Sequence, residues 1–253
     1  MPSIPLSDCV WPDVSQPYLS AFQDAVDFVA REFDSVVGVF ACGSVTRGAG
    51  DASSDIDLYV VHRANFRQRV QKFFRGVPAE IFVNPPHVIE GYFEEDWHSR
   101  RLLTAHMLGT GVLVWQSDPV VLALQAQARA FLARSPDVPA DLTMHRYLLA
   151  CGFEDALDKL EKDPPTARLI LNALMQRLLD FAFLKAGVRV PRFKDMLSEL
   201  RRNHPALGDL ALCFYGADSL EEQVAHAEAL MDALVGARGF FEWSSPPETT
   251  QNS

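Results

Sequence analysis

The sequence predicts an N-terminal α/β domain of the α+β kind, with a mixed sheet, followed by an all-α helical bundle domain. Over residues 1–117, β-branched runs alternate with helical patterns, whereas the chain after residue 117 carries helical patterns alone. The 253 residues are enough for two modest domains, and the 48% hydrophobic and 22% charged fractions exclude a disordered chain. We expect domains at 1–117 and 118–243, and a flexible tail at 244–253.

Local patterns predict the elements of the N-terminal domain in chain order. Apolar residues spaced three and four apart between Leu19 and Phe33 predict a helix. The basic stretch Ala64–Phe74 is also predicted to be helical. Four short runs bounded by Gly, Pro or polar residues predict strands: Val36–Ala41, Ile56–Val61, Pro78–Val83 and Gly111–Trp115.

The second half carries the start, stop and periodicity signals of helices. Asp163 followed by Pro164 is typical of a helix N-terminus, and Gly187 is typical of its end. Ala167–Leu184 between them is apolar on nearly every side, as expected for the central helix of a bundle. Further helices are predicted at 119–134, 140–161, 192–203 and 219–236.

The segment between the first two predicted strands carries the most chemical information. Gly43-Ser44 follows the first strand, and Asp55-Ile-Asp57 opens the second. Strand alternation places Asp55 and Asp57 on one face, where two carboxylates repel each other unless a cation lies between them. Mg²⁺ held by carboxylates and substrate phosphates fits that need. The Gly-Ser turn offers backbone N–H groups and a hydroxyl to phosphate oxygens.

This arrangement resembles the nucleotidyltransferase superfamily related to DNA polymerase beta, whose pattern is Gly-Ser, a short spacer and Asp-x-Asp. Combined with a C-terminal helical bundle, it is most similar in architecture to the antibiotic nucleotidyltransferases, notably the aminoglycoside adenylyltransferases. The motif itself covers residues 40–61. Elsewhere the resemblance is architectural, with the helical domain implied to bind substrate.

The resemblance implies that AMP from ATP, or a nucleoside monophosphate from another NTP, is transferred to a hydroxyl of a small acceptor such as an aminoglycoside, with release of pyrophosphate. Gly43 and Ser44 would bind the β- and γ-phosphates, and Asp55 and Asp57 would hold two Mg²⁺ ions. Glu80, on the third predicted strand, matches the family's third carboxylate. It would ligate a metal or accept the proton of the acceptor hydroxyl; a solvated glutamate on an edge strand is the alternative.

Three further features carry weaker predictions. Arg47 lies in the phosphate-binding loop and would contact the triphosphate, although a solvent-facing arginine fits the pattern equally well. Lys194 resembles a lysine of the adenylyltransferase helical domain that reaches the phosphates, and an ordinary lysine in the first turn of a helix is the alternative. The acidic run Glu94–Asp96 suits a cationic substrate, although a solvated helix start is the simpler interpretation.

Composition limits the partners. The net charge is −10 and is spread evenly, because residues 1–117 carry 9 − 14 = −5 and residues 118–253 carry 14 − 19 = −5. This argues against a large nucleic-acid surface. No apolar run reaches the length of a membrane-spanning helix, and we expect a soluble, cytoplasmic protein. The alternative functions are a nucleotide-binding regulator, an antitoxin-like interaction module, or a nucleotidyltransferase acting on a protein. The oligomeric state stays open.

Overall fold

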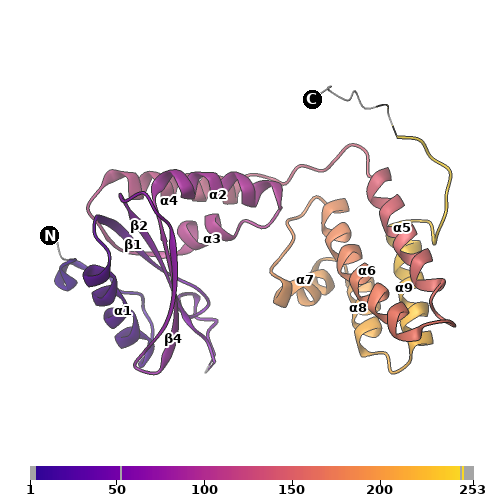
Figure 1. Cartoon of the computed structure of the whole chain (residues 1–253), viewed down its shortest axis with the longest axis horizontal. Helices are drawn as coiled ribbons and strands as arrows, with labels where there is room; N and C mark the ends of the chain where they lie inside the picture. The colour runs from indigo at the N-terminus through magenta and orange to yellow at the C-terminus, as the bar shows by residue number, and fades with distance from the viewer. Residues whose placement is uncertain (1–3, 52, 246, 248–253) are drawn as a thin grey trace. The chain divides into compact units, whose positions relative to one another are not determined.

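The computed structural model describes residues 4–51, 53–245 and 247, and the chain divides into two compact units, Met1–Arg134 and Ser135–Ser253 (Figure 1). The division comes later than the expected boundary at residue 117. The reason is helix α4 (Pro119–Ala133), whose apolar face packs in the core of the first unit. Of the expected tail, residues 246 and 248–253 lie outside the described residues.

The first unit is built on a five-stranded mixed sheet in the order β3-β4-β2-β1-β5. Strands β2 and β4 run parallel, and the other neighbours are antiparallel. The bounds of the strands are β1 Val36–Cys42, β2 Ile56–His62, β3 Gln68–Phe74, β4 Val77–Asn84 and β5 Val112–Gln116.

Helices cover both faces of this sheet (Figure 1). Helix α1 (Tyr18–Glu32) packs on one face, where its buried side chains join a cluster of apolar residues. Helices α2 (Pro86–His98), α3 (Leu103–Thr110) and α4 pack on the other. Because β1 is covered from both sides, all seven of its residues are buried. The predicted fold class, a mixed-sheet domain followed by helices, is confirmed.

The prediction of a helix at Ala64–Phe74 is wrong, because this stretch contains the edge strand β3. Most side chains of β3 are exposed on both faces, so the strand lacks the alternating apolar pattern that would identify it. The signal that was missed is the two-residue turn Arg75-Gly76. Both residues have positive φ, 50° and 81°, as the tight turn of a β-hairpin requires.

The second unit is all helical and has its own apolar core. Its helices are α5 (Thr143–Leu157), α6 (Pro164–Lys185), α7 (Met196–Asn203), α8 (Pro205–Gly216) and α9 (Leu220–Leu234). Asp163 caps α6 by accepting a hydrogen bond from the Thr166 N–H at 3.3 Å. Helix α8 was not predicted. In the described part of the chain, no helix combines the length and apolar character needed to cross a membrane.

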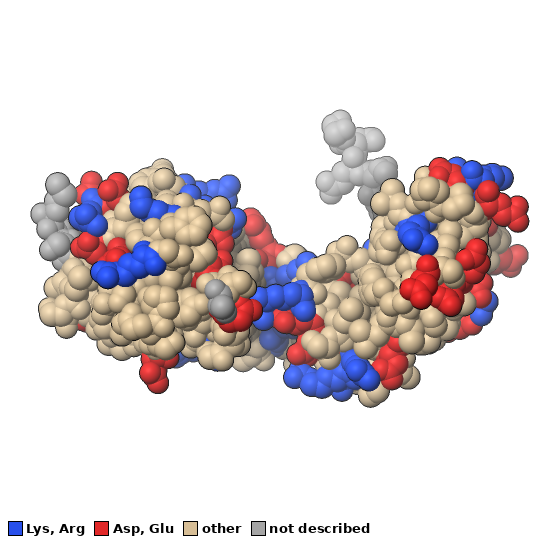
Figure 2. Space-filling view, turned by 90° about the horizontal axis from the view of Figure 1, so that it is seen from below, with Lys and Arg blue, Asp and Glu red and all other residues tan. Residues whose placement is uncertain are grey.

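Acidic and basic side chains are interspersed on the surface of each unit in the view of Figure 2. The cations are therefore distributed among anions there, in keeping with the even charge of the two halves of the sequence.

Candidate active site

The loop that follows β1 passes very close to Asp57. Gly43 has a φ of +93°, which favours glycine, and a Cβ built on it would lie 2.4 Å from Asp57 Oδ2. Only glycine therefore fits here without displacing the carboxylate. Ser44 then begins the 3-10 turn Val45–Arg47, and its side chain does not cap that turn.

The rest of this loop is fixed by local hydrogen bonds. The Tyr18 hydroxyl of α1 donates to the Asp51 carbonyl at 2.7 Å, and the Ser53 N–H donates to the Asp51 carboxylate at 2.9 Å. Ser54 Oγ accepts from the Asp51 N–H at 2.8 Å, so Ser54 stabilises the turn. Asp55 follows this turn, is exposed, and is the residue immediately before β2.

Pairing of the strands places four residues in one row across the sheet, which we call the acidic row: Cys42, Asp57, Glu80 and Gln71. Asp57 is the register partner of Cys42 on β1 and of Glu80 on β4, and Glu80 is the partner of Gln71 on β3. Neighbouring strands lie about 4.8 Å apart, so the two carboxylates are adjacent on one face. Asp55 precedes Asp57 by two residues and shares that face.

The Glu80 carboxylate makes two contacts with β3. Gln71 Nε2 donates to Glu80 Oε1 at 3.3 Å, and Arg69 Nε lies 3.5 Å from the same oxygen. The Arg69 guanidinium also lies over the Phe82 ring, 4.6 Å from its centre. Arg69 and Gln71 were not predicted as site residues, because a helix was expected where β3 lies. The hairpin turn Arg75-Gly76 is the signal that could have identified them.

The three predicted carboxylates do not form a ready cluster. Within the described residues, no three His, Cys, Asp or Glu side chains lie close enough together to hold a metal ion. Glu80 instead contacts Arg69 and Gln71. The donor chemistry of Asp55 and Asp57 nevertheless fits Mg²⁺, which proteins commonly hold through one or two carboxylates together with substrate phosphates.

Charges near the end of β1 affect the buried Cys42 thiol. Burial raises the pKa of Cys42, the Asp57 carboxylate raises this pKa further, and the Arg47 guanidinium lowers it. Arg47 and Asp57 therefore act on the same small region. Lys194 belongs to the second unit, in the 3-10 turn Phe193–Asp195, where it is exposed. Its contact with phosphates stays a prediction.

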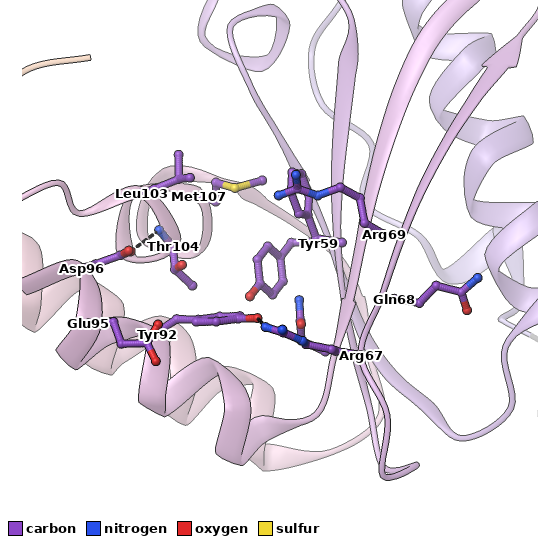
Figure 3. Close-up of a pocket in the computed structure, with 12 residues that line it drawn as sticks. Tyr59, Arg67, Gln68, Arg69, Tyr92, Glu95, Asp96, Leu103, Thr104 and Met107 are labelled. Carbon is purple, nitrogen blue, oxygen red and sulfur yellow. Dashed lines mark hydrogen bonds between the residues drawn. The ribbon is translucent and has the colours of Figure 1, made fainter. Parts of the chain in front are cut away.

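A cavity of about 580 Å³, which we call the sheet cavity, lies between the sheet and helices α2 and α3 (Figure 3). Its wall includes Tyr59 and Phe82, which follow Asp57 and Glu80 by two residues on the same strands and are register partners of each other. The sheet cavity therefore begins one strand repeat beyond the acidic row, on the same face.

Residues 23–107 match the family described as the nucleotidyltransferase domain. The match includes the loop after β1, Asp55, Asp57 and Glu80. The first unit contains a nucleotidyltransferase domain. The match supports nucleotidyl transfer as the general class of reaction. Helices α4 to α9 lie outside the matched residues.

One solved structure similar to this chain is a nucleotidyltransferase-like protein from Exiguobacterium sibiricum 255-15. The sequence identity is 13% and the TM-score is 0.50, with 86% of this chain and 74% of that chain covered. At this identity the likeness concerns the fold alone. No curated protein sequence matches the chain.

Proposed function

We propose that the protein is a Mg²⁺-dependent nucleotidyltransferase that transfers a nucleoside monophosphate, AMP from ATP, to a hydroxyl of a small acceptor such as an aminoglycoside. The observation that carries the proposal is the close approach of Gly43 to Asp57. The turn that we assign to the phosphates and the carboxylate that we assign to the metal therefore lie at one point, as transfer at the α-phosphorus requires.

Each predicted residue has a role in this proposal. Gly43 and Ser44 bind the β- and γ-phosphates through N–H groups and the hydroxyl, and Arg47 adds a positive charge beside them. Asp55 and Asp57 hold the metal. When bound, Mg²⁺ offsets the negative charge that develops on the attacking and leaving oxygens. The contribution of Lys194 and of the helical unit to substrate binding stays a prediction.

In the reaction, the acceptor oxygen forms a bond to the α-phosphorus. The bond between that phosphorus and the oxygen bridging to the β-phosphorus breaks, and pyrophosphate leaves with its electron pair. The hydroxyl proton passes to Glu80. Both contacts from β3 reach Glu80 Oε1, so we assign the proton to Oε2.

The test is pyrophosphate release from Mg–ATP against a panel of aminoglycosides and other hydroxyl-rich antibiotics. We expect release with one acceptor class and its loss in Asp57→Asn, which removes a metal-binding charge but keeps the side-chain shape. Circular dichroism melting should show an intact fold in the variant. Full activity of Asp57→Asn would overturn the metal assignment. Asp27→Asn, on the exposed surface of α1, is the matched control.

The second candidate is a nucleotide-binding regulator. The observation that favours it is that the Glu80 carboxylate, the predicted proton acceptor, contacts Arg69 and Gln71. Isothermal titration with Mg–ATP, combined with the assay of pyrophosphate release, separates the two functions. A regulator would bind nucleotide without releasing pyrophosphate in the presence of any acceptor, including protein acceptors.

A further inference from the structure

We propose that the sheet cavity binds the acceptor, and that among the small hydroxyl-bearing acceptors of the proposed function it selects a zwitterion of amino-acid or dipeptide type in place of an aminoglycoside. The inference rests on the proposed function for the role of the hydroxyl. The binding of a zwitterion in the cavity rests on the cavity itself, and it can be measured without nucleotide.

The position of the cavity assigns it to the acceptor and not to the nucleotide. In the strand order β3-β4-β2-β1, the phosphate-binding turn follows β1, whereas Glu80 and the cavity wall lie toward β4 and β3. Tyr59 and Phe82 stand one strand repeat, about 7 Å, beyond Asp57 and Glu80. A ligand in the cavity can therefore extend one hydroxyl-bearing arm to the acidic row.

Opposite charges face each other across the cavity. Figure 3 shows Arg67 and Arg69 on the strand side and Glu95 and Asp96 on α2. The Arg67 guanidinium donates a hydrogen bond to the Tyr92 hydroxyl. Among the described residues, neither Arg67 nor Glu95 forms an ion pair across the cavity. Arg67 thus reaches α2 through the Tyr92 hydroxyl and not through a carboxylate, and the cavity of about 580 Å³ leaves space for a ligand beside this contact.

A zwitterion matches both walls. Its carboxylate would accept charge-assisted hydrogen bonds from Arg67, and its ammonium group would donate to Asp96. A ligand with positive charges alone would leave its far end against the arginines, and a ligand with negative charges alone would face the carboxylates. Such unfavourable contacts discriminate between ligands as strongly as the favourable ones.

Buried polar groups give the cavity further binding capacity. Tyr59 is only 2% exposed, and no described residue meets its hydroxyl with hydrogen-bond geometry, although the Asn84 amide is near. The Thr104 N–H donates to Asp96 Oδ2 at 2.6 Å, which fixes the carboxylate in place. An unpartnered buried hydroxyl is costly, and a polar ligand group would satisfy it. A volume of about 580 Å³ suits a small molecule of dipeptide size.

The experiment is isothermal titration of the full chain, without nucleotide, with four probes of graded charge. They are the dipeptide seryl-phenylalanine, its C-terminal amide, its N-acetyl derivative and the aminoglycoside kanamycin. We expect the zwitterionic dipeptide to bind about tenfold or more tightly than the other three, because each lacks one of the two opposite charges.

Two variants test the two walls separately. Arg67→Ala should abolish the preference for the dipeptide over its amide, and Asp96→Asn should abolish the preference over the N-acetyl derivative. Arg31→Ala and Asp27→Asn alter an exposed ion pair on α1, which packs on the opposite face of the sheet, and should leave all affinities unchanged. Melting curves of each variant establish that the fold persists.

Several outcomes would overturn the inference. Equal binding of the amide, tighter binding of kanamycin, equal binding of the N-acetyl derivative, or no binding by any probe would each do so. Failure of the proposed function is separate: it is absence of pyrophosphate release with Mg–ATP and a dipeptide that does bind. Release with an aminoglycoside but no dipeptide binding would support the transferase and overturn the zwitterion site.

Discussion

The two faces of strand β2 differ in kind. Ile56, Leu58 and Val60 point to the face under α1, and all three are fully buried in a cluster of apolar side chains. Asp57 and Tyr59 point to the other face, where the acidic row and the sheet cavity lie. A single strand thus contributes alternate residues to a closed core and to an open polar site.

Under the proposed function, residues on one face of β2 stabilise the fold and residues on the other serve the reaction. Burial of Ile56, Leu58 and Val60 removes apolar surface from water and stabilises the fold. The opposite face gives up part of that stabilisation, because Asp57, Glu80 and Asp96 are only partly buried. Substitutions on the two faces should therefore affect different measurements.

The largest effect is expected at the loop that meets the polar face. In Gly43→Ala, the new methyl group would lie 2.4 Å from Asp57 Oδ2, at a φ that alanine disfavours. We expect kcat to fall about 100-fold or more, because small misplacements of reacting groups have effects of this size. Gly48→Ala, also at positive φ but with no atom within 4 Å of the added carbon, is the control for backbone strain. An equal loss of kcat in both variants would mean that the close approach to Asp57 is not the cause.

On the apolar face, Leu58→Ala should lower the free energy of unfolding by about 2–5 kcal/mol, because it leaves a cavity in a closed core. The kcat of the folded fraction should stay close to that of the parent. Urea denaturation and turnover at a temperature where both proteins are folded provide the two readouts. A large loss of kcat with unchanged stability would mean that the apolar face also takes part in the reaction.

On the polar face, Asp96 should make stability depend on pH. Burial raises its folded-state pKa above the ordinary value of 3.8, partly opposed by the hydrogen bonds from Thr104. The folded protein then binds the proton more tightly than the unfolded chain. The contribution of Asp96 to stability is fully present below pH 3.8 and is lost as the pH rises through the higher folded value. The free energy of unfolding of the parent should therefore fall, relative to that of Asp96→Asn, as the pH rises from 3 to 7.

The smallest effect is expected for Tyr59→Phe. This change removes a buried hydroxyl that lacks a hydrogen-bonding partner among the described residues, so stability should be unchanged or rise by up to about 1 kcal/mol. A decrease in the free energy of unfolding, measured by denaturation, would mean that the hydroxyl already has a hydrogen-bonding partner in the folded protein. Tyr59→Phe should also weaken dipeptide binding if the hydroxyl serves the ligand.

Sequence reasoning was most successful where the signal was local. The spacing of Gly43, Asp55 and Asp57 lies within one strand-loop-strand segment, and the alternation along β2 follows from the chain alone. The helical second unit also follows from local periodicity and from the cap at Asp163. These features depend on neighbours within a few residues in the chain.

Features that depend on the order of the strands in the sheet could not be predicted from the sequence. The amino acids by themselves predicted the two strands with Asp57 and Glu80, but only the parallel pairing of β2 with β4 made these residues neighbours. Only the tertiary structure placed Arg69 and Gln71 against Glu80 and packed α4 on the first unit. The physical reason is that an edge strand exposed on both faces has no periodic pattern of its own, and its position is decided by the backbone hydrogen bonds of a distant neighbour.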